Sequence, residues 1–393
     1  MMRVLFFGSL LLGSLGRISF FASGQGTIYL FEPFIALYVA HWFWLHRGQW
    51  QKLIRSALAR AVMLFIAVLE VGIITGFTQY TLWQNTVAIL YLGRLSMYLL
   101  ALIVVAYELK HRTDTHLSRY FNKYTMLVVA VSVVQFIFFP SLWPIRPMGW
   151  DPHLFRMVGT IFDVSVAASV YGLLFWRTAL AAGLTRRFRI FGVSVLGLCL
   201  LLTFSRSAYL AMIVAGPSLL VMQPTYWRAL QRRSVIIGGI ATLLAVVGLF
   251  AFVSMKGEGE GLNLLRTSTI SSRANDYREG LIIYREHPVL GVGYNRIRAH
   301  KSTGYEVVEG VRSLNHAGAA FHSSFLTILV TGGALGLLAF LYLLYQVASI
   351  SPMLRIQVIF LSVASLFDNV LLHPIILALL LLSVATSVYK KHE

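Results

Sequence analysis

Long apolar runs separated by short polar segments make up most of the chain. A bilayer core of about 30 Å needs roughly 20 apolar residues per helix, and about twelve runs of that kind follow one another. The sequence therefore predicts an all-α polytopic membrane protein, with residues 1–393 forming a single transmembrane domain. The predicted spans lie near residues 4–22, 26–46, 59–77, 86–107, 123–140, 157–178, 188–204, 206–222, 234–254, 321–349, 354–371 and 372–389.

Composition agrees with this pattern. Of the 393 residues, 58% are hydrophobic and 12% are charged. Because that charged fraction is about half the usual one, an ordinary soluble protein is excluded. The single cysteine, Cys199, lies in an apolar run, so neither a disulfide nor a Cys-based zinc site is expected.

Basic residues are distributed unevenly between the two sides of the predicted membrane. The net charge of +18 first suggests a nucleic-acid partner. The basic residues, however, gather in segments 47–60, 110–123, 177–189 and 228–233, on the side that also holds both termini. Positive charge in short loops marks the cytoplasmic face of a membrane protein. We therefore expect cytoplasmic termini and no nucleic-acid partner.

Residues 1–26 have a second interpretation. Arg3 precedes an apolar run and small residues follow, as in a secretory signal peptide. A retained first helix is preferred, because its removal would leave an odd number of spans and place the two termini on opposite sides of the membrane.

One polar segment, residues 255–320 between the ninth and tenth predicted spans, is much longer than the others. Loops beyond about 15 residues are uncommon in compact folds and are usually functional. The charge pattern places this large loop, with its short helices, on the outer face. Within it, Ser271 or Ser272 is predicted to cap a helix that ends at Pro288, and residues 291–293 indicate a turn.

Two arginines are predicted to face outward. A cap at Ser271 or Ser272 would place Arg273 in a first helical turn, where backbone N–H groups favour an anion such as phosphate. One helix over residues 188–222 would be about 52 Å long, so the chain must break near Arg206, at the outer membrane surface. The alternatives are a solvated helix face for Arg273 and contact with lipid phosphate for Arg206.

Two histidines accompany these arginines. His322 begins the tenth predicted span, and the glycines that follow it, Gly332, Gly333 and Gly336, indicate close helix packing. An imidazole at this position is either a general base or a satisfied structural residue. His316, slightly earlier in the loop, competes for the same role.

The cytoplasmic segments lack the groups that nucleotide-sugar enzymes use. They contain no Asp-x-Asp pair, no clustered carboxylates and no glycine-rich phosphate loop. The sequence therefore predicts no metal and no other cofactor. Because the polar residues face outward, away from the ATP supply, the substrate must arrive already activated.

Four motifs, in their order along the chain, resemble the O-antigen ligase and polymerase superfamily. They are Arg156-Met-Val-Gly-Thr160, Thr203-Phe-Ser-Arg-Ser-Ala-Tyr209, Ser272-Arg-Ala-Asn-Asp-Tyr277 running into Glu286-His-Pro-Val-Leu-Gly-Val-Gly-Tyr294, and Phe321-His-Ser-Ser-Phe-Leu326. The predicted topology, with one long loop late in the chain, is also similar to that family. Ser323 stands where the family often has an asparagine.

The resemblance implies a glycosyltransferase in the bacterial inner membrane, among membrane lipids, with its active site facing the periplasm. Such an enzyme moves a glycan from undecaprenyl diphosphate to an acceptor hydroxyl. It uses no metal and inverts the anomeric centre. Surface polysaccharide or lipopolysaccharide synthesis is the expected process.

The resemblance also implies roles for particular residues. Arg206 and Arg273 match the arginines that hold the diphosphate, and His322 matches the histidine that acts on the acceptor. The possible secondary residues are Arg156, Tyr277 and His316. No carboxylate close in the sequence orients His322, so Glu306 or Glu309 of the loop is a candidate for that task.

The acceptor is open among three kinds. A ligase uses a lipid A-core glycan, a polymerase uses another lipid-linked repeat, and a protein-directed relative uses serine or threonine. The short segment after the last predicted span disfavours the protein-directed kind, and the spacing of Arg206, Arg273 and His322 favours a ligase.

Two functions of other classes fit the same topology. A lipid-linked glycan flippase or transporter would explain the number of spans and the charges within them, although no internal repeat is visible. A non-catalytic scaffold for envelope assembly would explain the fold but not the outward arginines.

Several charged residues fall within the predicted spans. Because a charge in the bilayer is costly, we expect these side chains to face the bundle interior, with Arg17 pairing with Glu32 across the first hairpin. The charged residues are Arg17, Glu32, Glu70, Arg94 and Asp163.

Overall fold

The computed structural model describes residues 2–19, 26–109, 115–148, 153–181, 184–222, 268–302, 305–308, 311–314 and 320–387. This part of the chain is mostly helical, as predicted, and is that of a helical membrane protein. The helices are α1 (Met2–Leu11), α2 (Glu32–Leu45), α3 (Trp50–Ile54), α4 (Ala57–Thr75), α5 (Leu82–Leu109), α6 (Thr115–Phe138), α7 (Val164–Leu180), α8 (Arg186–Leu201), α9 (Arg206–Met222), α12 (Ser268–Glu286), α13 (Ser324–Ile350), α14 (Pro352–Ala364) and α15 (Pro374–Ala385).

Short elements connect these helices. Two antiparallel hairpins pair β1 (Arg17–Ser19) with β2 (Thr27–Tyr29) and β3 (Tyr305–Val308) with β4 (Val311–Leu314). The 3-10 helices are η1 (Gly13–Gly16), η2 (Phe77–Gln79), η3 (Trp143–Met148) and η5 (Ile297–Ala299). Neither hairpin was predicted, because three- and four-residue strands leave too weak an alternation in the sequence.

In the described part of the chain, four helices are long and apolar enough to cross a membrane. These are Ala57–Thr75, Leu82–Leu109, His116–Phe138 and Ser324–Ile350. Shorter apolar helices lie in four of the other predicted spans; they are Met2–Leu11, Val164–Leu180, Pro352–Ala364 and Pro374–Ala385. The ninth predicted span, 234–254, lies outside the described residues, so the number of twelve spans stays a prediction, as does the single domain.

The first predicted span, 4–22, is wrong as a single helix. α1 ends at Leu11, and the chain continues through η1 into β1. Gly13 has a φ of +52°, and a Cβ at that position would lie 2.8 Å from Thr160 Oγ1. The close approach to residue 160 therefore requires a glycine, and its left-handed backbone ends the helix. The second predicted span likewise contains β2 before α2 begins at Glu32.

The last two predicted spans are also shorter than expected. α14 ends at Ala364 and α15 begins at Pro374, so residues 365–373 form a non-helical connection. Pro374 lies in the first turn of α15, a position that suits proline, and His373 caps that helix by accepting a hydrogen bond from the N–H of Ile375. The apolar sequence hid this interruption, which proves central to the candidate site.

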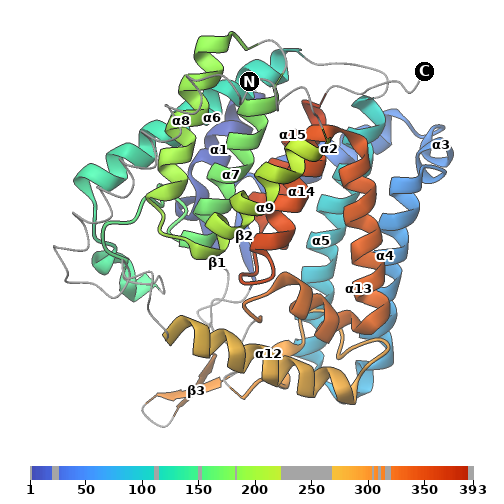
Figure 1. Cartoon of the computed structure of the whole chain (residues 1–393). Helices are drawn as coiled ribbons and strands as arrows, with labels where there is room; N and C mark the ends of the chain where they lie inside the picture. The colour runs from blue at the N-terminus through green and yellow to red at the C-terminus, as the bar shows by residue number, and fades with distance from the viewer. Residues whose placement is uncertain are drawn as a thin grey trace.

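α12 lies across one end of the helical bundle, at the bottom of the view in Figure 1. α1 begins and α15 ends toward the opposite end of the bundle. The connection between α14 and α15 reaches toward α12. The fold therefore brings a segment near residue 370 next to a helix that begins near residue 270.

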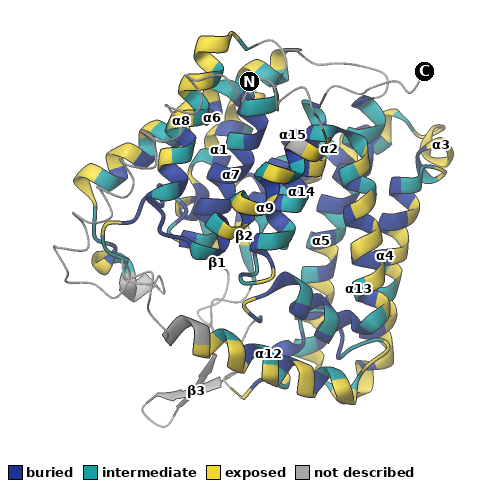
Figure 2. Ribbon diagram, viewed as in Figure 1, coloured by how far each residue is buried: buried dark blue, intermediate teal, exposed yellow. Residues whose placement is uncertain are grey.

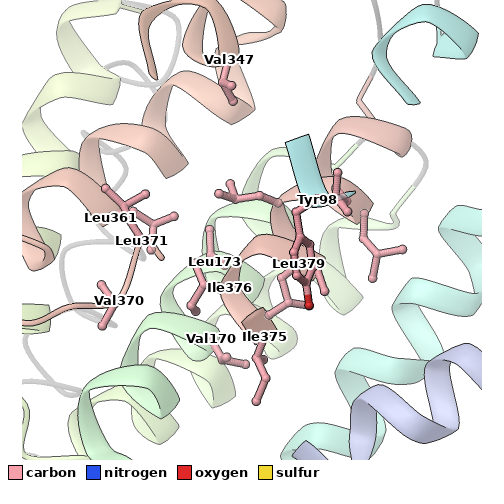
Figure 3. Packing of buried hydrophobic residues seen from close by; sticks show 14 of the residues in the cluster. Tyr98, Val170, Leu173, Val347, Leu361, Val370, Leu371, Ile375, Ile376 and Leu379 are labelled. Atoms are coloured by element: carbon pink, nitrogen blue, oxygen red, sulfur yellow. The ribbon is translucent and has the colours of Figure 1, made fainter. Parts of the chain in front are cut away.

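The bundle core is formed by helices from the whole length of the chain. Figure 3 shows side chains of α5, α7, α13, α14 and α15 packing together, among them Tyr98, Leu173, Val347, Leu361 and Ile376. Figure 2 shows exposed faces on the outer helices. Large apolar side chains lie on those faces, including Ile74, Phe138, Phe191 and Leu338. Such a surface suits contact with lipid.

Charges within the predicted spans do not pair as expected. Glu32 accepts hydrogen bonds from Arg94 Nε (2.6 Å), Arg94 Nη2 (3.0 Å) and the Tyr98 hydroxyl (2.8 Å), so the predicted pair of Arg17 with Glu32 is wrong. Glu70 and Asp163 are exposed rather than directed into the bundle. Asp163 instead caps α7, where its carboxylate accepts from the N–H groups of Ser165 and Val166.

α13 contains a break that joins it to the segment after α12. Gly333 has φ +64° and ψ −165°, which are not helical values. Around this break, the Ala334 N–H donates to Pro288 O (2.9 Å) and the Val292 N–H donates to Val330 O (2.9 Å). A Cβ on Gly333 would lie 2.2 Å from backbone atoms of Val289. The packing around Gly333 is close, as expected, but its partner is a loop backbone rather than a helix, so the predicted helix packing is wrong at this glycine.

We expect Gly333→Ala to destabilise the protein by about 1–3 kcal/mol or more, because the substitution adds steric overlap to a backbone conformation that disfavours a side chain. Thermal unfolding in detergent measures the effect. Gly336→Ala is the matched control, since a Cβ there would meet its nearest neighbour, Ile328 O, at an ordinary 3.7 Å. Equal losses of thermal stability in the two variants would contradict this account.

Candidate active site

The predicted break between two spans is confirmed at Arg206. α8 ends at Leu201, and Arg206 is the first residue of α9. Between them Phe204 has a φ of +54°, and the Thr203 hydroxyl accepts a hydrogen bond from the Ser205 N–H (3.2 Å). This local turn places Arg206 at the start of a helix and leaves its side chain partly exposed.

Arg156 lies on a segment that packs against this break. The Met157 N–H donates to Leu202 O (3.0 Å), and the Gln135 side chain accepts from the N–H groups of Val158 (3.0 Å) and Gly159 (3.0 Å). The Arg156 side chain is buried. The structure therefore brings the segment of Arg156 next to the segment of Arg206, although they come from separate motifs.

Arg273 lies in the second turn of α12 rather than in its first. The helix begins at Ser268, so neither Ser271 nor Ser272 caps it, and the predicted anion site at the helix N-terminus is wrong. The Arg273 guanidinium is instead held by a carboxylate. Its Nη2 lies 2.8 Å from Asp368 Oδ1, and the other oxygen of Asp368 accepts from the Ser207 hydroxyl (2.6 Å).

Asp368 therefore joins the start of α9 to α12. Arg273 Nε is buried and makes no hydrogen bond within the described residues. Buried N–H groups almost always have an acceptor, so this one is suited to a bound anion. The ion pair fixes the guanidinium while leaving donor capacity for a ligand.

His322 is oriented by Asp276, which lies three residues after Arg273 on α12. Asp276 Oδ2 accepts from the His322 backbone N–H (2.9 Å) and also contacts the ring Nδ1. Its other oxygen lies 2.8 Å from Lys301 Nζ. The candidate partners Glu306 and Glu309 are not needed for this task; Glu309 and the side chain of Glu306 lie outside the described residues.

Hydrogen bonds keep Asp276 ionised. Burial by itself raises the pKa of this carboxyl group, but hydrogen bonds from His322 and Lys301 outweigh burial and lower the pKa to about 2. The carboxylate beside Nδ1 favours the tautomer of His322 that carries its proton on Nδ1. Such an arrangement leaves Nε2 as the atom able to accept a proton.

The His322 side chain is 46% exposed and lines a cavity of about 860 Å³. We name this space the His322 cavity; it is also lined by Asn275, Arg278, Glu279 and Glu286 of α12. His300 lines it too, but its Nε2 is engaged with the Tyr80 hydroxyl at 2.7 Å. His322 is thus the histidine better placed for chemistry in this cavity.

The 365–373 connection makes hydrogen bonds both to the start of α13, next to His322, and to α12. The Ser323 hydroxyl donates to Ser365 O (3.0 Å) and caps α13 by accepting from the Leu326 N–H (3.2 Å). The Ser324 hydroxyl donates to Asn369 Oδ1 (2.9 Å), and the Tyr277 hydroxyl donates to Leu366 O. Ser323 therefore has a structural role at the position where the family often has asparagine.

The structure brings Arg206, Arg273 and His322 onto neighbouring segments. Tyr277 of α12 is hydrogen-bonded to Leu366, in the same connection as Asp368. His316 lies outside the described residues. Asp276, Asp368 and Lys301 were missed from the sequence. Asp276 stands in a motif that drew attention for its arginine, and Asp368 is a carboxylate in an apolar run, which by itself marks a functional candidate.

Comparison with known proteins agrees with the motifs. Residues 191–341 match the family model described as O-antigen ligase. The match covers less than half of the chain and supports its resemblance to the O-antigen ligase family. The matched region contains Arg206, Arg273, Asp276 and His322, whereas Asp368 lies beyond it. No curated protein matches the chain.

The match to the O-antigen ligase family model supports a membrane enzyme of the glycosyltransferase kind that acts in surface polysaccharide synthesis. Enzymes of that kind in general use a lipid-linked glycan and an acceptor. Among the described residues, no group of three or more His, Cys, Asp or Glu side chains is placed to hold a metal ion.

The lowered pKa of Asp276 predicts a pH-dependent contribution to stability. The folded pKa of about 2 lies below the usual 3.8, so the contribution is complete above pH 3.8 and is lost as the pH falls through about 2. The difference in melting temperature between the protein and Asp276→Asn should therefore narrow as the pH decreases from about 6 to about 2. Thermal unfolding of both proteins at a series of pH values measures this difference in melting temperature.

Asn275→Ala is the control for this experiment. Asn275 lies next to Asp276 and lines the same cavity but does not titrate, so its effect should not change with pH. A difference for Asp276→Asn that widens toward low pH would contradict the prediction.

Proposed function

We propose that this protein transfers a glycan from undecaprenyl diphosphate to an acceptor hydroxyl on the periplasmic face, in the manner of an O-antigen ligase. One observation carries the proposal: α12 holds Arg273 and Asp276 three residues apart. The Nε of Arg273 is buried without a hydrogen-bond partner among the described residues, and Asp276 binds His322. Residues three apart share a helix face, so an anion site and a base are supported by one rigid element.

The arginines fit the donor. Breaking a bond between a sugar and a diphosphate develops negative charge on the leaving group. The Arg273 guanidinium, which Asp368 holds in place, and the guanidinium of Arg206 would stabilise that charge more in the transition state than in the ground state. Arginine suits this role because its planar donors match phosphate oxygens and it does not lose its proton.

His322 fits the acceptor. Its Nε2 would take the proton of the acceptor hydroxyl as the oxygen attacks the anomeric carbon, while Asp276 stabilises the resulting imidazolium. The bond from the acceptor oxygen to that carbon forms as the bond to the diphosphate oxygen breaks. Undecaprenyl diphosphate leaves with the bonding electrons, and His322 later releases its proton to water. Attack opposite the leaving group inverts the anomeric centre, and no metal takes part.

Two other functions remain for the experiment to exclude. A polymerase of the same superfamily would use the same groups on a second lipid-linked repeat unit. A flippase would bind the same lipid but would need no base, and the Asp276–His322 pair argues for chemistry rather than transport. A lipid A-core acceptor is preferred because the spacing of Arg206, Arg273 and His322 favours a ligase.

Alanine substitution tests the assigned roles. His322→Ala should lower the rate of transfer by roughly 100-fold to 10,000-fold, the usual contribution of a general base. Arg206→Ala and Arg273→Ala should each lower it by a similar order, because each removes charge stabilisation in the transition state. Release of undecaprenyl diphosphate from reconstituted protein is the measurement.

Arg278→Ala is the matched control for the arginines, since Arg278 is exposed on α12 and lines the His322 cavity without contacting Asp368. We expect it to retain most of the activity. Transfer that survives the combined Arg206, Arg273 and His322 substitutions would rule out these roles.

Offering both acceptors in one reconstituted assay distinguishes the functions. A ligase should add one glycan to lipid A-core and release one carrier per product, whereas a polymerase should lengthen the lipid-linked glycan. Product length on a gel separates the two. Movement of labelled lipid-glycan across vesicles without any covalent change would contradict an enzyme and support the flippase.

A further inference from the structure

A second cavity of about 470 Å³ lies next to the His322 cavity. We name it the α5 cavity because one face of α5 lines it from Trp83 to Tyr98. Ala299 and Ala320 line the α5 cavity, whereas His300, one residue after Ala299, and His322, two residues after Ala320, line the other one. The two cavities therefore lie against the same two chain segments. The proposed reaction leaves the α5 cavity without a role.

Aromatic rings and polar groups share its wall. The rings are Tyr80, Trp83, Tyr91, Tyr98 and Tyr294. Trp83 is 45% exposed, whereas Tyr98 is buried, so rings extend from the surface into the bundle. Amides of Gln84, Asn295 and Asn369 and hydroxyls of Thr327 and Thr331 lie between them. Flat apolar faces beside hydrogen-bonding groups match a sugar ring, which has both kinds of surface.

The charges that line the α5 cavity are all positive. Arg17, Arg94, Arg296 and Arg298 line it, and no carboxylate does among the described residues. Glu32 binds Arg94 from behind the wall. Arg296 donates to Ile73 O (2.9 Å) and to Asn85, both uncharged, so these bonds leave its charge in place. The cavity therefore favours an anion.

Asn295 also lines the α5 cavity, between Tyr294 and Arg296. Its φ of +59° is a left-handed value that asparagine adopts more readily than most residues, so it fits this turn without a glycine. The volume also lies within the roughly 300–1,000 Å³ of small-molecule sites.

We propose that the α5 cavity binds an acidic sugar unit, bearing a carboxylate or a phosphate, of a glycan substrate. Rings hold the sugar face, amides bind its hydroxyls, and the arginines bind the acidic group. The link to a substrate glycan rests on the proposed function, but binding does not require that transfer occurs. The site would make the protein select glycans that carry an acidic unit.

Binding to the purified full chain tests this proposal. The probes are an oligosaccharide of hexuronic acid, a phosphorylated oligosaccharide and a neutral one of equal length, with affinity measured by calorimetry in detergent. We expect the acidic probes to bind more tightly than the neutral one. Arg298→Gln should lower the affinity for an acidic probe by about tenfold and leave the affinity for the neutral probe unchanged, because it removes only a charged donor. Trp83→Ala should lower the affinity for every probe.

Arg278→Gln is the matched control, an arginine that lines the His322 cavity instead. If Arg278→Gln and Arg298→Gln lower the affinity for acidic probes equally, the preference reflects general attraction of anions by a basic protein, and the proposal is overturned. Equal affinity for acidic and neutral probes would overturn it as well. Preference for one acidic probe identifies the acidic group.

The outcome is separable from that of the proposed function. His322→Ala should lower the rate of transfer as stated above and keep the binding preference, since His322 does not line the α5 cavity. If the wild-type protein transfers glycan but shows no preference for acidic probes, only this inference is overturned. If it binds acidic probes selectively but transfers no glycan, only the proposed function is overturned.

Discussion

The ion pair between Arg273 and Asp368 is the contact on which the arrangement of the site depends. Asp368 also accepts from Ser207, next to Arg206, and the segment around it binds Ser323 and Ser324, next to His322. A charge removed from water is costly unless it is paired and hydrogen-bonded. Asp368 therefore fixes the groups around it, and three distant parts of the chain meet at one carboxylate.

A second carboxylate, Asp276 on α12, performs a different task. Asp276 is ionised because His322 and Lys301 outweigh its burial, so it orients the imidazole without taking its proton. Asp368 holds a cation for an anionic ligand, and Asp276 holds a base. Arg273 of the anion site and Asp276, which holds the base, both lie on α12. The distance between anion site and base is therefore set by a helix rather than by a loop, which suits a reaction that needs both at once.

The elements that could be predicted were those with a strong local signal. The helix before Pro288, the turn at residues 291–293 and the break before Arg206 follow from proline, glycine and the length of an apolar run. The start of α12, the end of α1 and the connection at residues 365–373 could not be predicted. Each depends on contacts between distant residues, such as Gly13 against Thr160 and Ser324 against Asn369.

The sequence by itself determined that the chain belongs in a membrane, that its late polar segment is special, and which arginines and histidine to consider, since hydropathy, loop length and residue chemistry are local properties. Only the tertiary structure decided their partners. Asp276 lies 46 residues from His322 and Asp368 lies 95 residues from Arg273, and no local periodicity encodes which carboxylate meets which cation. The packing of α12 across the bundle end determines these pairs. A buried charge needs an opposite charge beside it, and the fold decides which residue lies there.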